Sequence, residues 1–359
     1  MKLPILTKDI IRKNLPELKA TNIPASKFME SHSSGSTGEP LTFYSDNQTY
    51  SRRWAQTFRC WGWAGYEPGD PYVKISLNPR QKFTKRVQDA LMRCSYVYSF
   101  GINEQTIDSY LQKMKNAKII RGYPTSLYLM AKLMEKADMH LHPSAITTTG
   151  DMLFPHYRKA IETQFNCRVF DGYGGEGIVA SFECEKHEGY HICQEDTVIE
   201  FLRGDEHANP GETGEIILTN LNNYVMPFLR YKVGDLGKSS DHICSCGRNL
   251  SMMESIEGRD SDIIVTPSGD FLVVHFFTIF FDHLAGVDQF QVRQKSIDNI
   301  IILIVKNDKF TTADEQYIKS GIQKYVGENV RLEMDYVESI PLSRSGKRRF
   351  VISDVPLKF

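Results

Sequence analysis

Helical and extended patterns alternate along the middle of the chain. Apolar side chains recur at helical spacing over residues 106–118 and 125–137, and a short apolar run at 118–124 between them ends in a proline turn. Residues 156–165 predict another helix, and residues 167–174 predict the strand that follows it. Helices that alternate with short apolar strands are typical of α/β proteins. We therefore predict mixed sheets flanked by helices in this part of the chain.

The pattern becomes predominantly extended over residues 181–240. Residues 190–202 and 211–221 are rich in strand-forming side chains, and the stretch at 204–214 holds the glycine, proline, Asp and Asn residues that favour turns. A further short strand is expected from Leu41 to Tyr44. We predict a β-rich subdomain next to the α/β region.

A change of domain is predicted near residues 256–272. Beyond it the pattern predicts, in order, a helix, two strands, a helix and a strand, at 275–284, 288–294, 299–306, 313–327 and 330–337. These elements make an α+β unit of about 100 residues, which is a normal size for a domain. We predict a large N-terminal domain at 1–259 and a small C-terminal domain at 260–359.

Composition and charge exclude several classes of protein. The chain has 359 residues, is 41% hydrophobic and carries a formal net charge of −1, so nothing favours a nucleic-acid partner or an anionic membrane surface. No apolar run approaches the roughly 20 residues of a membrane-spanning helix. The first residues, MKLPILTKDI, lack the apolar core of a signal peptide. We expect a cytoplasmic protein, whose seven cysteines are reduced or bind a metal.

Residues 33–40, SSGSTGEP, place hydroxyl and glycine residues together just before the strand at 41–44. Glycine lets backbone N–H groups approach an anion closely, and Ser and Thr add side-chain donors, so the loop suits a phosphate group. It is not a Walker P-loop, because it ends in Gly-Glu-Pro where that motif has Gly-Lys-Ser or Gly-Lys-Thr. A flexible linker is the alternative.

Further motifs follow this loop in the order found in one enzyme superfamily. They are TTGDM at 148–152, DGYGGEG at 171–177, RYKVGDL at 230–236, GRDSD at 258–262 and PLSRSGKRRF at 341–350. Together with the loop they resemble the adenylate-forming superfamily, which includes acyl-CoA ligases and peptide-synthetase adenylation domains. The resemblance covers nearly the whole chain.

The resemblance implies the role of each matching residue. The phosphate loop would cradle the β- and γ-phosphates of ATP through Ser33, Ser34, Gly35, Ser36, Thr37 and Gly38. The nucleotide pocket would be formed by Gly150, Asp151, Asp171, Tyr173 and Gly174, with Tyr173 against the adenine, Asp235 on the ribose hydroxyls and Arg259 beside them. Lys347 would be the catalytic lysine, and Glu176 would help to hold Mg²⁺. The family pattern has two residues between Gly and Glu, whereas YGGE has one.

Within the superfamily the chain resembles the phenylacetate–CoA ligase-like proteins, in particular the branch found with capsular-polysaccharide biosynthesis genes. The segments that carry this resemblance are IIRGYPTSLYLMA, FECEKHEGYHI, MPFLRYKVGDL, CSCGR and VVHFFTIFFD. The implied function is ATP-dependent activation of a carboxylic acid as an acyl-adenylate, with release of pyrophosphate. The acyl group then passes to coenzyme A or an amine, while the C-terminal domain rotates about a hinge at 259–262. The alternative is a catalytically weak binding or scaffold protein on the same fold.

A second cluster of residues has the composition of a metal site. Two thiols spaced Cys-x-Cys, together with a distant Cys and His, can close a tetrahedral Zn²⁺ site, and we favour Cys184, His191, Cys244 and Cys246. His187 is the rival histidine ligand. Resemblance to the same branch also suggests a structural zinc, and four protein ligands would leave no open position for catalysis. The alternative is a set of reduced thiols and polar turn residues.

Relatives in this family carry a longer segment before the phosphate loop, whereas only 32 residues precede Ser33 here. A short natural form, a trimmed chain or a partner chain that supplies the missing surface would each account for this. Exposed apolar surface would favour a homodimer.

Overall fold

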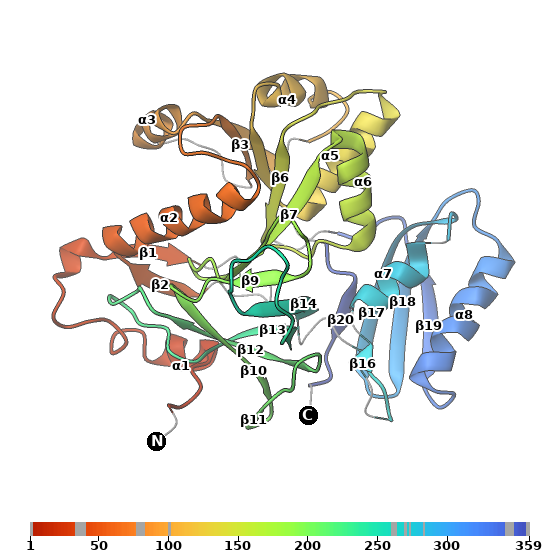
Figure 1. Ribbon diagram of the computed structural model, residues 1–359. Helices are drawn as coiled ribbons and strands as arrows, with labels where there is room; N and C mark the ends of the chain where they lie inside the picture. The colour runs from red at the N-terminus through yellow and green to blue at the C-terminus, as the bar shows by residue number, and fades with distance from the viewer. Residues whose placement is uncertain are drawn as a thin grey trace.

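The computed structural model describes residues 3–32, 41–76, 83–99, 102–259, 264–268, 271–272, 274–282, 284–341 and 348–356. A twelve-stranded mixed sheet with flanking helices forms the larger part, and a four-stranded sheet with two helices forms a smaller C-terminal part beside it (Figure 1). The predicted α/β architecture with a β-rich region and a small α+β unit is confirmed.

The first half of the large sheet consists of parallel strands. In sheet order they are β7 (Arg168–Tyr173), β6 (Ala145–Thr149), β5 (Ile119–Gly122), β3 (Tyr72–Ser76) and β4 (Cys94–Tyr98). The connecting helices are α3 (Phe83–Leu91), α4 (Ile107–Met114), α5 (Pro124–Lys136) and α6 (Pro155–Phe165). The predicted helices and strands at 106–174 are confirmed, with the expected alternation along the chain.

The parallel strands bury apolar side chains on both faces, as such sheets do. Val73, Ile120 and Ile146 lie in one core cluster with side chains of α4, α5 and α6. On the other face Tyr72 and Ile119 pack with Trp61 of the long helix α2 (Asn47–Trp63). The sheet is therefore the middle layer between α2 and the three later helices.

The second half of the large sheet is antiparallel and contains the predicted β-rich region. Its strands are β8 (Ser181–Glu183), β9 (Tyr190–Ile192), β10 (Thr197–Arg203), β11 (Glu206–His207), β12 (Thr213–Asn220), β13 (Tyr231–Ser240) and β14 (Met252–Arg259). The extended stretch at 190–202 is two strands, because the backbone turns between Cys193 and Asp196.

Near the N-terminus, α1 (Lys8–Lys13) and the 3-10 turn η1 (Ala25–Lys27) precede a β-hairpin. The hairpin strands are β1 (Met29–His32) and β2 (Thr42–Ser45), and they pair in register from Met29 with Ser45 to His32 with Thr42. The strand expected at 41–44 is thus confirmed. Residues 33–40, which carry the predicted phosphate loop, lie between the two strands and outside the described residues.

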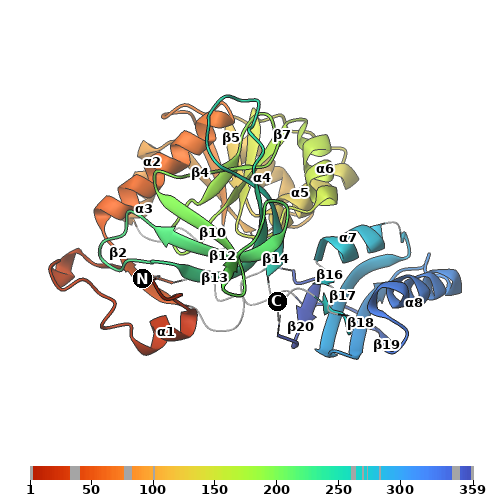
Figure 2. The same cartoon turned by 60° about the horizontal axis from the view of Figure 1, so that its bottom comes forward.

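The C-terminal part contains every element that its sequence predicts. They are α7 (Val274–Asp282), β17 (Val287–Ser296), β18 (Asn299–Lys306), α8 (Thr312–Val326) and β19 (Arg331–Tyr336). Two additions are the hairpin β15 (Ile264–Val265) with β16 (Phe271–Leu272) and the strand β20 (Val351–Ser353), which runs parallel to β17. Figure 2 shows this part to one side of the large sheet.

The division between the two predicted domains stays a prediction, and the sheets are compatible with it. Arg259 is the last described residue of the chain that pairs within the large sheet. The next described strand belongs to the small hairpin at 264–272. The two parts touch where the ring of Phe350 packs against that of Phe154, with centroids 5.0 Å apart. Among the described residues no helix is both long and apolar enough to cross a bilayer.

Candidate active site and metal centre

A cavity of about 740 Å³ lies where the C-terminal part meets the carboxyl ends of β6 and β7. Its wall includes the segments at 150–154 and 171–177, together with Asp235 of β13 and Arg348 and Arg349 of the C-terminal part. Ligands of open α/β sheets bind at such strand ends. The fold thus brings seven sequence-predicted residues to one cavity: Gly150, Asp151, Asp171, Tyr173, Gly174, Glu176 and Asp235.

The remaining predicted nucleotide-site residues lie at the borders of the described structure. Residues Ser33 to Gly38 and Lys347 fall outside it. Their described neighbours Ser31 and His32, on one side, and Arg348, on the other, line the cavity. The backbone of Arg259 pairs with that of Asp235 across β13 and β14. The described residues next to both segments therefore line the cavity, and the roles of Ser33 to Gly38, Lys347 and Arg259 stay predictions.

Tyr173 and Asp235 form a linked pair on the cavity wall. The Tyr173 hydroxyl donates a hydrogen bond of 2.9 Å to Oδ2 of Asp235, and so joins β7 to β13. The bond fixes the carboxylate and the aromatic ring next to each other. This is an arrangement that can offer a ring face to a base and carboxylate oxygens to vicinal hydroxyls.

The turn after β7 is tightly constrained. A Cβ on Gly174 would stand 2.1 Å from the carbonyl oxygen of Ile178, so only glycine fits there. Glu176 adopts a left-handed backbone with φ of 46°, and its Oε1 accepts a 3.3 Å hydrogen bond from the Tyr231 hydroxyl. The shortened motif thus still presents a carboxylate to the cavity. Such an oxygen donor is of the kind that Mg²⁺ prefers.

Asp151 holds the start of α5 against the end of β6. Its Oδ2 accepts hydrogen bonds from the Thr125 backbone N–H at 3.2 Å and from the Thr125 hydroxyl at 2.5 Å. A carboxylate at this position also meets the positive end of the helix dipole. Gly150, with φ of 92°, lets the backbone pass the ring of Tyr123, which a Cβ would approach to 2.9 Å.

Asp171 belongs to a buried polar network that sequence reasoning missed. Its carboxylate accepts hydrogen bonds from the hydroxyls of Thr148 at 2.5 Å and Tyr190 at 2.8 Å. Burial, together with the nearby charge of Glu183, raises the pKa of Asp171 to about 6. Because both oxygens already have protein partners, Asp171 shapes the cavity wall; its contact with a cofactor stays a prediction.

Arg158 and Glu183 complete this network. Arg158 donates two hydrogen bonds to the Glu183 carboxylate, of 2.7 and 2.9 Å, and Glu183 Oε2 accepts the Asp171 backbone N–H at 2.9 Å. Burial acts to raise the pKa of Glu183, but the bonds from His187 and Arg158 hold it below its ordinary value. No motif in the sequence marks this network, because Glu183 ends the short strand β8, Ser-Phe-Glu, whose burial only the structure shows.

His187 lies in the network and not among the cysteines. Its Nδ1 is 3.3 Å from Oε2 of Glu183, and its ring lies 4.7 Å from that of Phe170. This placement removes the rival to His191 as the fourth member of the cysteine cluster.

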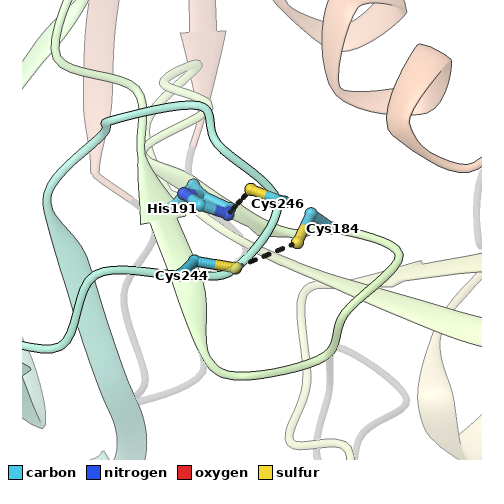
Figure 3. Close-up of side chains that lie close together, drawn as sticks. All are labelled: Cys184, His191, Cys244 and Cys246. Atoms are coloured by element: carbon cyan, nitrogen blue, oxygen red, sulfur yellow. Dashed lines mark hydrogen bonds between the residues drawn. The ribbon is translucent and has the colours of Figure 1, made fainter.

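The four favoured metal ligands come together, as Figure 3 shows. Their ligand atoms all lie within 4.8 Å of one another, with 3.7 Å between the sulfurs of Cys184 and Cys244 and 3.3 Å between Cys246 Sγ and His191 Nε2. A tetrahedral zinc with Zn–S bonds of about 2.3 Å requires sulfurs about 3.8 Å apart. The described cluster therefore fits a closed Cys₃His site.

Bonds around the cluster hold its two loops together. Glu188 accepts the backbone N–H and the hydroxyl of Ser245 at 3.1 and 2.7 Å, and Arg248 pairs with Glu185 at 2.9 Å. His191 is buried, and its Nδ1 has no hydrogen-bond partner within the described part of the chain. These contacts position the loops that carry the four ligands, and they leave the ligand atoms available to a metal.

Comparison with known proteins shows what this chain is similar to. A family profile described as the CapK C-terminal domain matches residues 264–354. Protein CapK of Staphylococcus aureus is 26% identical over 367 residues, which cover 98% of this chain and 80% of CapK. Phenylacetate–coenzyme A ligase of Escherichia coli K12 is 22% identical over 391 residues, covering 95% and 82%.

A solved structure extends the comparison to the fold. The crystal structure of 2-hydroxyisobutyryl-CoA ligase in its postadenylation state is 17% identical, with a TM-score of 0.77 over 98% of this chain and 80% of that one. The same ligase in its thioesterification state gives a TM-score of 0.61. Both the large sheet and the C-terminal part therefore have counterparts in a CoA ligase.

These findings support the predicted resemblance to the adenylate-forming superfamily, and the chain shares the fold of an acyl-CoA ligase. Within that class the chain is similar to phenylacetate–coenzyme A ligase and to CapK, and the CapK C-terminal domain profile matches its residues 264–354.

Proposed function

We propose that this protein activates a carboxylic acid with ATP, forming an acyl-adenylate and releasing pyrophosphate. The observation that carries the proposal is the convergence of four separate motifs on one cavity. Residues from the ends of β6 and β7, from β13 and from the segment at 348–350 all line it. A chance resemblance of one motif would not bring the other three segments to the same cavity.

The reaction joins two anions, so the site must neutralise charge while it holds an in-line geometry. Tyr173 lies against the adenine, and Asp235 accepts hydrogen bonds from the ribose hydroxyls. The loop at 33–38 surrounds the β- and γ-phosphates with backbone N–H and hydroxyl donors. Lys347 brings a positive charge to the oxygens of the carboxylate and the α-phosphate.

Glu176 is the residue that would hold Mg²⁺, which supplies charge neutralisation at the phosphates when bound. Cys184, His191, Cys244 and Cys246 would hold Zn²⁺ as a structural ion, because four protein ligands complete its tetrahedron. Both assignments rest on the donor types and on the positions of the side chains.

In the second step the acyl group passes to coenzyme A or to an amine. The C-terminal part rotates about residues 259–262 between the steps, and Arg259 turns with it. The higher TM-score to the postadenylation form than to the thioesterification form of the compared ligase supports an arrangement that precedes this rotation. The resemblance to the branch found with capsular-polysaccharide biosynthesis genes suggests a sugar amine as one such acceptor.

Pyrophosphate release with ATP, Mg²⁺ and a panel of carboxylic acids tests the proposal. One acid should stimulate release, and Lys347→Ala should reduce that rate by about 100-fold or more, with ATP affinity nearly unchanged. Lys309→Ala is the matched control, because Lys309 is exposed and does not line the cavity.

Two results would contradict the proposal in different ways. Equal turnover in Lys347→Ala and the parent would remove the role of that lysine. Tight ATP binding without turnover on any acid would favour the alternative, a binding or scaffold protein on an adenylation fold.

A further inference from the structure

A second cavity, of about 470 Å³, adjoins the nucleotide cavity on the α2 side of the sheet. The two share the turn at 172–177 as a common wall, and Arg53 of α2 lines both. A Cβ on Gly177 would lie 3.4 Å from an Arg53 guanidinium nitrogen, so that guanidinium reaches the shared turn. A molecule that spans the turn can therefore face ATP at one end and the second cavity at the other.

The floor of this cavity is a row of polar side chains that crosses three neighbouring strands of the sheet. Lys74 of β3 pairs in register with Arg121 of β5, and Arg121 pairs with Thr147 of β6, so the three side chains project from one face. Two positions earlier, the same register carries the apolar residues Tyr72 and Ile119. The α2 face of the sheet thus changes from apolar to cationic toward the carboxyl ends of its strands.

The charges on the wall have one sign. Arg53, Lys74, Lys85 and Arg121 line the cavity, and none of its described lining residues is an aspartate or a glutamate. Among the described residues neither arginine forms an ion pair. Arg121 lies over the ring of Trp61 at 5.9 Å, and Arg53 lies over that of Tyr50 at 5.0 Å. The aromatic rings orient the guanidinium groups without neutralising them.

One further polar group lies beside this cavity. Thr147 lines the cavity, and its Oγ1 is buried without a hydrogen-bond partner in the described structure. Buried polar groups are nearly always paired, so this hydroxyl is available to an acceptor that reaches the cavity wall. Burial and the charge of Arg53 lower the pKa of Arg121, and Tyr123, Tyr72 and Cys94 oppose this shift only in part.

We propose that the second cavity recognises an acid substrate with two anionic groups. One carboxylate reacts with ATP beside the turn at 172–177, and a second carboxylate or a phosphate, remote from it, binds Arg121 and the neighbouring donors. This inference rests on the proposed adenylation and adds the charge class of the acid. Trp54, Trp61 and Phe182 provide the apolar surface for the body of the substrate.

Matched pairs of acids test this charge preference. Benzoate is compared with benzene-1,3-dicarboxylate, butyrate with glutarate, and glycerate with 3-phosphoglycerate, both by pyrophosphate release and by calorimetric binding without ATP. In at least one pair the doubly charged acid should bind and react roughly 10- to 100-fold better, the range expected for a charge-assisted hydrogen bond. If no pair shows this preference, the inference is wrong.

Arg121→Met should abolish the preference of the parent, while the singly charged acid changes by less than about threefold. Arg121→Lys should restore part of it, since a charge returns without the planar fork. Lys118→Met is the control, because Lys118 precedes β5 at the opposite end of the strand and lines neither cavity. ATP affinity, measured in every variant, reports correct folding.

The readouts separate the sources of failure. If Arg121→Met weakens coenzyme A and leaves the doubly charged acids unaffected, the cavity holds a phosphate of the acceptor and the inference is overturned. If doubly charged acids bind through Arg121 but no pyrophosphate appears, the cavity is assigned correctly and adenylation fails. Equal losses for both acids of a pair would show a structural role for Arg121 and contradict the inference.

Discussion

Removal of one proposed zinc ligand should loosen two parts of the large domain from each other. The ligands Cys184 and Cys244 are 60 residues apart in sequence, and His191 and Cys246 are 55 apart. In the chain-entropy treatment of cross-links, closing a loop of that size stabilises the fold by about 4 kcal/mol. Cys246→Ser should therefore lose the metal and lower the midpoint of thermal unfolding by about 10 °C.

The assay is metal content per chain, measured by a zinc-sensitive dye after denaturation, together with thermal unfolding before and after a chelator. Cys167→Ser is the matched control, because Cys167 is a partly buried thiol outside the cluster. The parent and the control should contain one zinc and lose stability with the chelator, whereas Cys246→Ser should contain none. Equal metal content in Cys246→Ser and the control, or no effect of the chelator, would refute the assignment.

The polar network around Asp171 leads to two further predictions. Arg158→Met should lower the free energy of unfolding by about 3 kcal/mol, because it leaves the buried Glu183 without its cation; Arg168→Met, at an exposed position on β7, should change it by less than about 0.5 kcal/mol. The raised pKa of Asp171, from 3.8 to about 6, means that the folded state binds its proton more tightly than the unfolded state. As the pH rises from 4 to 6, stability should therefore fall by about 2 kcal/mol relative to Asp171→Asn, out of about 3 kcal/mol for the complete titration. Urea unfolding across this range checks both, and parallel pH profiles of the parent and Asp171→Asn would contradict the second.

Helices and strands with a regular pattern of apolar side chains could be predicted from the sequence. A helix that turns polar side chains toward a cavity could not. The helices α5 and α8 and the strand β18 match their predicted ranges closely, because each keeps one regular apolar pattern. The helix α2 was not predicted. One of its sides carries Arg53, Trp54 and Thr57 toward the second cavity, which interrupts an apolar stripe.

The candidate site shows the same division. Tyr173, Glu176 and Asp235 could be found from the sequence because each lies in a short motif of neighbouring residues, and the fold brings the motifs together at strand ends. The ion pair of Arg158 with Glu183 could not, since it depends on how α6 packs against β8.

The row of Lys74, Arg121 and Thr147 has a signal in the sequence. It can be recognised once the free energy of burying a charge is considered. YVKIS, IIRG and AITTT each place a polar residue third in a parallel strand, directly after two apolar or aromatic residues. Desolvating an unpaired charge costs several kcal/mol, so a sheet covered on both faces should exclude Arg121 unless something compensates it. Among the described residues no carboxylate pairs with Arg121. An anionic ligand in the second cavity, next to the ATP site, would supply this compensation, as proposed for that cavity.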